Sequence, residues 1–328
     1  MRLSHAKYAL ALLMVCLRAA AQTPPPRQID IGAADAPLSD TERVDLDAAV
    51  KKHDYAAEKK VIDKALGEHP NSFELLVMAG RLAYLEKKPK DAADALTRAD
   101  KIKTIPEQDR LTLALALEFT QDSQRGREEL LKLLKIAPQN AEYLYLLGRM
   151  DERNQNLEQA VNDFTKAIQL DPNLVRAYED LGNAQQDLGR FDESRKTFEK
   201  GAAVNRKLSV HWEWSPLDLG VAALKANEYD EAEKLFRESL EYRPRFAWGH
   251  YYMGQLFQKK ERHDEAIAEY KEAVVDDPRL RQAWLALGRE FARQGDKVQA
   301  DRAIAIFKKL EEQQKAIKEK PPATVLAR

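Results

Sequence analysis

Apolar residues recur along most of the chain at intervals that place them on one face of an α-helix. Two stretches show the same offsets of one, four, seven and eight positions: Ala160, Val161, Phe164, Ala167 and Ile168, and later Ala266, Ile267, Tyr270, Ala273 and Val274. Residues at these offsets lie on the same side of a helix. The pattern therefore predicts amphipathic helices, each with an apolar face that needs a neighbour.

Two columns of residues repeat with a period of 34. Glycines that follow an apolar residue are separated by 68, 34, 38, 34 and 34 positions, at Gly80, Gly148, Gly182, Gly220, Gly254 and Gly288. Prolines show gaps of 68, 34, 72 and 34, at Pro70, Pro138, Pro172, Pro244 and Pro278. Both columns slip by four residues in the same region, which indicates one repeated structural unit.

Each unit is predicted to be a pair of helices joined by a polar turn. Leu144, Leu147 and Gly148 mark a first helix, and Asn154-Gln155-Asn156 separates it from the helix that contains Phe164. Proline then ends the second helix because it has no amide hydrogen and clashes with the preceding turn. One hairpin cannot bury its apolar face alone, so stability is expected to come from stacked neighbours.

The spacing of these residues resembles the tetratricopeptide repeat. One unit contains LLGRMDERNQNLEQAVNDFTKAIQLDP within residues 141–174, and the last unit opens with AWLALG at 283–288. The resemblance implies an all-α fold, a right-handed superhelical solenoid of helix-turn-helix repeats. We expect about eight units of 34 residues over 39–314, starting near residues 39, 73, 107, 141, 175, 213, 247 and 281.

Some positions depart from the repeat. Ala114 replaces the usual glycine, Glu58 and Gly126 replace the usual alanine of the second helix, and Arg206 replaces the closing proline. Four residues are inserted between the fifth and sixth units, near 209–212. Insertions in surface loops cost little free energy, so a benign loop is one interpretation, and a bend, a register change or a functional element is the other.

Both ends of the chain are expected to lie outside the repeats. Residues 1–21 resemble a signal peptide, because basic residues precede an apolar run and small residues precede Gln22. That apolar run is shorter than the roughly 20 residues that span a bilayer, so we expect no transmembrane anchor. A lipid anchor at Cys16 is disfavoured by the bulk of Val15. Residues 22–38 predict a flexible, proline-rich leader, and 315–328 predict the end of a capping helix and a loose tail.

Composition and motifs argue against an enzyme. The 53 basic and 54 acidic residues are interspersed, so no patch for nucleic acid is visible. No phosphate-binding glycine loop and no HExxH or GxSxG motif is present. The histidines beyond residue 21 are interpreted as surface or turn residues at spacings unsuited to a metal: His53, His69, His211, His250 and His263. We expect no catalytic residues, no cofactor and no metal site.

The resemblance implies a binding groove lined by the first helix of each unit. We take as candidate peptide- or partner-binding residues Trp214, Trp248, Tyr251, Gln255, Asn183, Arg149, Tyr145 and Arg289. Trp214, Trp248 and Tyr251 are expected to form an apolar floor for a peptide, because tryptophan and tyrosine are common anchors of interfaces. The alternative is that these aromatic side chains pack between helices.

We therefore expect a non-enzymatic scaffold, monomeric or weakly self-associating, that holds a peptide or partner subunit. With the signal peptide, this is similar to bacterial envelope proteins of the family, periplasmic or secreted. Two alternatives stay open: a binding module for a non-protein ligand such as an envelope polysaccharide, and an assembly factor of a secretion, pilus or polysaccharide-export system.

Overall fold

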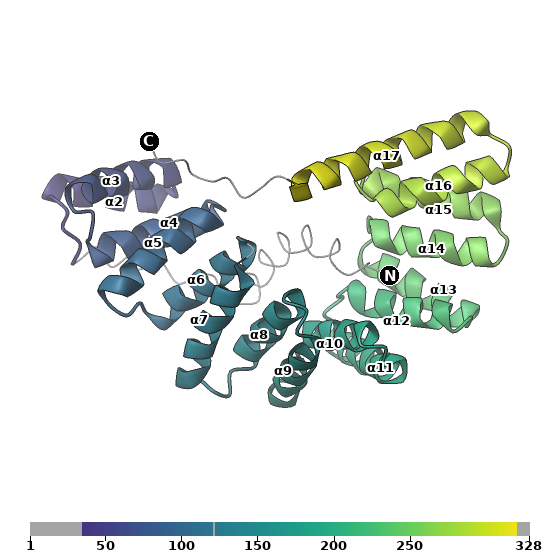
Figure 1. Ribbon diagram of the computed structural model, residues 1–328, viewed down its shortest axis with the longest axis horizontal. Coiled ribbons are helices and arrows are strands. Elements are labelled where there is room, and N and C mark those ends of the chain that lie inside the picture. Colours follow the sequence, from purple (N-terminus) through teal and green to yellow (C-terminus); the bar gives the residue numbers. More distant parts are fainter. Residues whose placement is uncertain (1–34, 121, 320–328) are drawn as a thin grey trace. The chain divides into compact units, whose positions relative to one another are not determined.

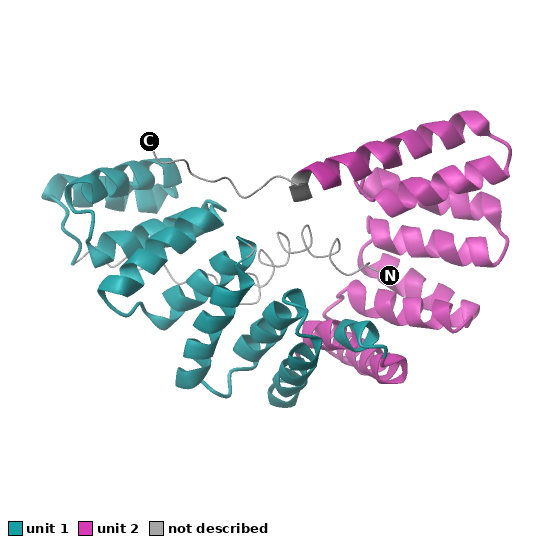
Figure 2. Cartoon of the chain, in the orientation of Figure 1, with its two compact units in different colours: residues 1–171, 183–189 teal, residues 172–182, 190–328 magenta. Residues whose placement is uncertain are grey.

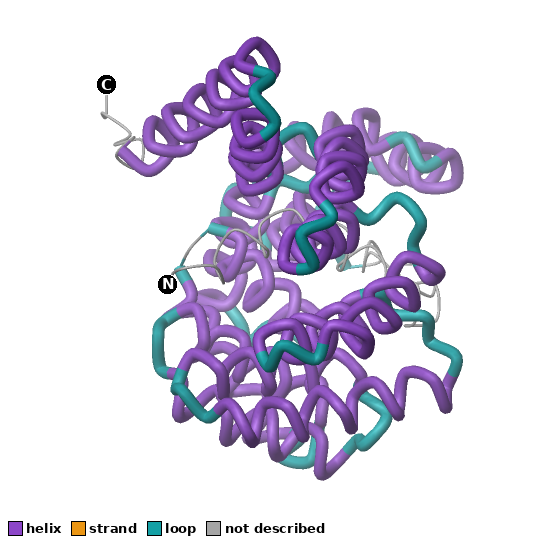
Figure 3. The backbone as a smooth tube through the Cα atoms, turned by 90° about the vertical axis from the view of Figure 1, so that its right-hand side faces the viewer, coloured by secondary structure: helices purple, strands orange, loops and turns teal. Residues whose placement is uncertain are grey.

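The computed structural model describes residues 35–120 and 122–319, and every regular element in these ranges is an α-helix (Figures 1 and 3). The helices alternate as first and second members of eight pairs. The first helices are α2 (Asp40–Lys52), α4 (Phe73–Leu85), α6 (Glu107–Phe119), α8 (Ala141–Arg153), α10 (Val175–Asp187), α12 (Trp214–Lys225), α14 (Ala247–Lys259) and α16 (Arg281–Arg293). The second helices are α3 (Tyr55–Glu68), α5 (Pro89–Ile102), α7 (Ser123–Ile136), α9 (Leu157–Leu170), α11 (Phe191–Leu208), α13 (Tyr229–Tyr242), α15 (His263–Asp276) and α17 (Lys297–Glu319). All of these helices but α11 and α17, which have 18 and 23 residues, are 12 to 14 residues long. The structure confirms the predicted all-α solenoid of helix-turn-helix repeats.

The chain forms two compact units, which Figure 2 shows in different colours. Unit 1 comprises residues 1–171 and 183–189, and unit 2 comprises residues 172–182 and 190–328, so that α10 is divided between them. Within each unit, a first helix packs against the second helix of its own pair and that of the preceding pair, as α14 does with α15 and α13. In unit 2 one hydrophobic cluster extends from Phe198 of α11 to Leu287 of α16.

Glycine in the first helix allows an aromatic ring of the second helix to approach its backbone. A Cβ atom added at Gly148 would lie 2.7 Å from the ring of Phe164, and one at Gly254 would lie 2.6 Å from the ring of Tyr270. Atoms cannot approach this closely without displacing the fully buried ring. The side chain that fills the space beside Gly148 is that of Phe164.

In the third pair, α6 and α7 also approach closely, but the glycine and the alanine at the contact have changed places. Ala114 stands where glycine is usual and Gly126 where alanine is usual, and a Cβ atom at Gly126 would lie 3.0 Å from the carbonyl oxygen of Ala114. The two departures therefore compensate for each other, because the contact needs one residue without a side chain and either helix can supply it.

The four-residue insertion is a helical extension rather than a longer loop. Five of the other second helices end two residues before a proline, as α9 does at Leu170, but α11 has Arg206 there and continues to Leu208. Without the ring of proline, the hydrogen-bond ladder is able to continue, although α5, with Thr104 at the same position, still ends at Ile102. Arg206 instead donates two hydrogen bonds to Glu238 of α13, at 2.7 and 2.6 Å.

The end of the predicted leader is packed rather than flexible. Ala36 and Leu38 are buried against Leu46 of α2 and Ile62 of α3. Arg43 also donates a hydrogen bond of 2.6 Å to the carbonyl of Ala36. The predicted signal peptide at 1–21, Cys16, leader residues 22–34 and tail residues 320–328 lie outside the described residues.

Unit 1 contains buried carboxylates between its helices. Asp109 accepts two hydrogen bonds from Arg81, at 2.6 and 2.7 Å, and Asp151 accepts one of 2.8 Å from Arg127. Asp163 of α9 is also buried, and this burial together with the charge of Asp151 raises its pKa to about 6. A buried pair needs both partners, since one charge left alone in the interior is strongly destabilising.

Candidate functional site

The first helices of unit 2 share one register, which aligns their side chains along a stripe. On each helix the stripe follows offsets of three or four residues, so that its members lie on one side. We call it the first-helix stripe; it consists of Trp214, Leu217, Val221 and Lys225 on α12, Trp248, Tyr251, Gln255 and Lys259 on α14, and Gln282, Leu285, Arg289 and Arg293 on α16. Five of the eight candidate residues belong to it.

The aromatic residues of the stripe differ in how much surface they present. Trp214 is only 7% exposed, because its ring packs edge-on against Phe246 with the centroids 4.8 Å apart. Tyr251 is 8% exposed, and its ring packs against that of Tyr270 with the centroids 5.9 Å apart. Trp248 is half-buried, with its ring edge-on to Tyr251 at 5.7 Å. Trp214 and Tyr251 therefore belong mainly to the core, and Trp248 carries most of the surface that a predicted aromatic floor offers.

Polar groups accompany Trp248 on the stripe. Gln255 donates a hydrogen bond of 2.7 Å to the hydroxyl of Tyr251, which keeps its own proton because burial raises the pKa of Tyr251 to about 12. The charge of Arg289 opposes this rise in pKa, which places the exposed guanidinium of α16 near the phenol of α14. The stripe thus combines one apolar surface, an amide, a neutral phenol and a cation.

The three remaining candidate residues lie in unit 1. Arg149 is 7% exposed, and its guanidinium pairs with Glu118 of α6 at 3.2 Å and lies 5.8 Å from the ring of Tyr145. Tyr145 is buried against Phe164, with their ring centroids 5.9 Å apart. Asn183 of α10 is half-buried. Arg149 and Tyr145 thus contribute to packing inside unit 1, and the role of these three residues in binding stays a prediction.

Two histidines, which the sequence suggested were surface or turn residues, contact carboxylates between helices. Nδ1 of His250 lies 2.7 Å from Glu269, and Nδ1 of His263 lies 2.8 Å from the fully buried Glu290. Burial lowers the pKa of His250, but its hydrogen bonds with Glu269 and the carbonyl of Pro244 outweigh this and raise the pKa above its usual value.

The position of His250 within the repeat could have indicated its contacts. It occupies the position of Tyr178 and Trp284, and each of the three side chains hydrogen-bonds the carbonyl of a proline six residues earlier, at 2.9 to 3.1 Å. A histidine that donates its Nε2 proton to this carbonyl presents Nδ1 to the carboxylate. Comparison of the repeats would therefore have placed His250 beside the hairpin rather than in solvent.

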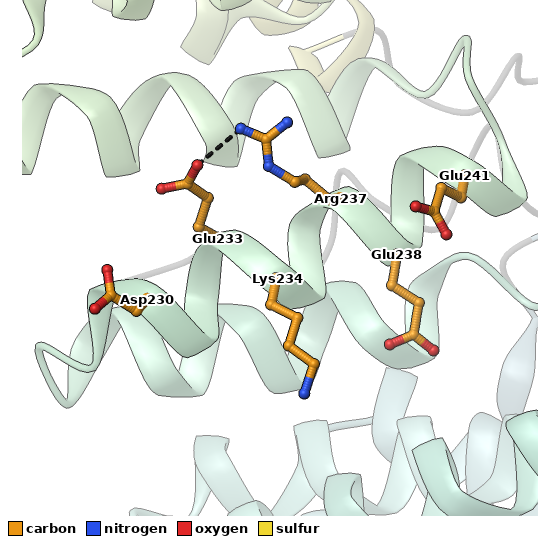
Figure 4. A pocket seen from close by; sticks show the side chains of 6 residues that line it. All are labelled: Asp230, Glu233, Lys234, Arg237, Glu238 and Glu241. Atoms are coloured by element: carbon orange, nitrogen blue, oxygen red, sulfur yellow. Dashed lines mark hydrogen bonds and ion pairs between the residues drawn. The ribbon is translucent and has the colours of Figure 1, made fainter.

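A charged pocket of about 570 Å³ lies along α13, lined by Asp230, Glu233, Lys234, Arg237, Glu238 and Glu241 (Figure 4). Its carboxylates are largely engaged: Glu233 pairs with Arg237 at 2.8 Å, and Asp230 with Lys260 at 3.2 Å. Among the residues that the structure describes, no group of three or more histidines, cysteines or carboxylates is arranged to hold a metal ion. The same residues include no helix long and apolar enough to cross a bilayer.

Comparison with protein families gives a consistent result. A tetratricopeptide repeat model matches residues 111–175, 179–244, 217–280 and 251–316, and a TPR repeat model matches 153–203. Superkiller protein 3 of Schizosaccharomyces pombe is 28% identical over 178 residues, which are 52% of this chain and 12% of that protein. The mitochondrial import receptor subunit TOM70 of Saccharomyces cerevisiae is 26% identical over 175 residues, 51% of this chain and 28% of that protein. The chain thus spans less than a third of either relative.

Solved structures show the same fold at low identity. A tetratricopeptide repeat protein from Parabacteroides merdae has a TM-score of 0.60 at 16% identity, covering 76% of this chain and 98% of that one. PilF of Pseudomonas aeruginosa has a TM-score of 0.54 at 19% identity, covering 68% and 97%. Repeat scaffolds of this kind are typically non-enzymatic and generally bind protein partners. Some distant relatives are named transferases, such as the O-mannosyl-transferase TMTC3 of Homo sapiens, 24% identical over 165 residues that are 47% of this chain and 18% of that protein.

Proposed function

Because the chain belongs to the tetratricopeptide repeat family, we propose that it is a non-enzymatic scaffold that holds a polypeptide segment of a partner on the first-helix stripe of unit 2. The partly exposed side chain of Trp248 carries this proposal. The ring of Trp248 packs against the rings of Tyr251 and Tyr252, with centroid distances of 5.7 and 6.0 Å. Because the side chain is already held in place, little side-chain entropy is lost when a ligand covers it. Gln255 and Arg289 provide polar contacts beside it.

A peptide fits this surface better than a polysaccharide does. A sugar chain usually stacks on a series of exposed aromatic rings, whereas Trp214 and Tyr251 are buried beside Trp248. A peptide needs one apolar anchor with hydrogen-bonding groups around it. A polysaccharide ligand, and a role in assembling a secretion, pilus or export system, remain the rival proposals.

We also propose that the protein works outside the cytoplasm, in the periplasm or as a secreted protein. The support is the sequence of residues 1–21, whose basic, apolar and small segments follow the order of a signal peptide.

A photo-crosslinking experiment in the native cell tests the proposal. A photoreactive residue at position 248 is expected to capture a recurring polypeptide in the envelope or secreted fraction, and one at position 234 on α13 is not. Replacing Trp248 with Ala should then weaken binding of the purified partner by at least about tenfold, the usual effect of losing an interface anchor.

Phe191→Ala is the matched control, because Phe191 is an exposed aromatic residue of the same unit that lies on the second helix α11. Unchanged affinity in the Trp248 variant would contradict the proposed site. Capture of polysaccharide rather than polypeptide at position 248 would favour the rival ligand, and a complex in the cytosolic fraction would contradict export.

A further inference from the structure

Exposed charges on the first helices of unit 2 are all of one sign. The sequences of α12, α14 and α16 contain two carboxylates, Asp218 and Glu290, and both are buried. The exposed charged side chains of these helices are Lys225, Lys259, Arg289 and Arg293. The first-helix stripe therefore presents positive charge.

The basic side chains are not needed to end these helices. Lys225, Lys259 and Arg293 are the last residues of α12, α14 and α16, where a cation interacts favourably with the helix dipole. The helices α4 and α6 of unit 1, however, end at Leu85 and Phe119. Since α2 and α8 of unit 1 end at Lys52 and Arg153, a terminal cation is not itself peculiar to unit 2; the distinction is that α12, α14 and α16 expose no carboxylate beside it.

Arg289 differs from its counterpart in unit 1 in having no carboxylate partner among the residues that the structure describes. Arg149 pairs with Glu118, which lies 31 residues earlier. The residue 31 positions before Arg289 is Gln258, and its amide donates to Glu290 at 2.7 Å. Arg289 makes no ion pair with a described residue, so its charge is available to a ligand.

The second helices that flank α14, which are α13 and α15, carry the opposite charge, whereas α11 and α17 of the same unit are net basic. α13 has five carboxylates against two basic residues, and α15 has five against one. The pocket on α13 has four carboxylates among its six lining residues (Figure 4). An anionic ligand is therefore attracted to the first-helix stripe and repelled from α13 and α15.

We propose that the segment held by unit 2 is acidic: an extended polypeptide that places an apolar side chain on Trp248 and Asp or Glu side chains near Arg289 and Lys259. This inference rests on the proposed function, and it specifies the chemistry of the partner. Complementary charge of this kind selects among partners and speeds their association.

Binding of matched peptides to the full chain tests this inference. Three fluorescent peptides share an apolar anchor and differ only in whether the flanking residues are Glu, Gln or Lys; both ends are blocked so that no terminal carboxylate contributes. Fluorescence anisotropy should show the Glu peptide binding about tenfold more tightly than the Gln peptide, as expected for two or more screened surface ion pairs. The advantage should shrink as NaCl is raised from about 50 to about 300 mM.

Arg289→Glu should weaken binding of the Glu peptide by about tenfold and leave binding of the Gln peptide nearly unchanged. Lys234→Glu, the same change on the exposed surface of α13, should have no effect on either. Circular dichroism and a thermal melt establish that each variant is folded.

Equal affinity for the Glu and Gln peptides, no binding of any peptide up to millimolar concentration, or equal effects of the two charge reversals would overturn the inference. The proposed function fails separately: if the wild type binds the Glu and Gln peptides equally and Trp248→Ala weakens both, the binding site stands although its preference for acid does not. If Trp248→Ala changes neither, the site itself is wrong.

Discussion

Replacing Asp163 with Asn should stabilise the protein at neutral pH. Asp163 is 5% exposed, and burial together with the nearby charge of Asp151 raises its pKa from 3.8 to about 6; Lys166 and Arg127 oppose this rise only partly. A carboxyl whose pKa is higher in the folded state disfavours folding once it ionises. Its penalty is nearly absent below the unfolded pKa, grows as pH rises through the interval between the two pKa values, and is complete above about 6.

The size of the effect follows from the shift in pKa. A shift of about two units, at 1.36 kcal/mol per unit, corresponds to about 3 kcal/mol at pH 7 and about 0.5 kcal/mol at pH 4. Asparagine has the shape of a protonated aspartate and carries no charge, so Asp163→Asn should remove this penalty. We therefore expect the variant to exceed the wild type in free energy of unfolding by about 3 kcal/mol at pH 7, with most of the gain lost between pH 6 and pH 4.

Urea unfolding followed by circular dichroism at several pH values measures the difference. Asp94→Asn on the exposed surface of α5 makes the same chemical change without burial, and should alter stability little at any pH. A destabilised Asp163→Asn protein at pH 7, or a difference that does not change with pH, would refute the reasoning.

Two further predictions concern residues packed within unit 2. Gly254→Ala should lower the free energy of unfolding by about 1–3 kcal/mol, because the new methyl group meets the ring of Tyr270. The control Gly67→Ala, in α3, places its methyl group where no atom lies within 4 Å and should raise the free energy of unfolding by about 0.5–1 kcal/mol through helix propensity. Melting temperatures that shift in the same direction for the two variants would contradict this pair of predictions. His250→Asn should lower the free energy of unfolding more at pH 6 than at pH 8.5. Because the pKa of His250 is raised in the folded state, its charged form stabilises the fold below the unfolded pKa of about 6.5, and this stabilisation is lost as pH rises through the folded pKa. A loss of stability that is the same at both pH values would show that Glu269 and Asp276 do not hold the charge of His250.

The sequence predicted the hairpins because their determinants are local. A proline two residues after a helix and a glycine beneath a ring act within a single unit, so the columns at Pro172 and Gly148 were sufficient to locate them. The extension of α11 was less visible, since the sequence shows that four residues are added but not whether they join the helix or the loop. Arg206 in place of proline allowed the helix to continue but did not require it, since α5, with Thr104 at the same position, ends at Ile102.

Exposure along the stripe depends on contacts between helices and was not predictable from one residue at a time. Trp214 and Trp248 share a register, yet Phe246, which precedes α14, covers Trp214. Arg149 and Arg289 also share a register, and the difference lies 31 residues earlier, at Glu118 and Gln258. Reading pairs at this separation would have distinguished the buried arginine from the exposed one.

The length of the α11 extension determines how the chain enters α12. Four residues advance a helix by about 6 Å and rotate it by about 400°, so the chain leaves within about 40° of the direction it would otherwise have taken. An addition of two residues would instead have turned the exit by about 200°, toward the opposite side of α11. A stack of hairpins therefore tolerates an extension of nearly one whole helical turn between two of its units. Among related chains, length differences at this junction should favour three or four added residues over two.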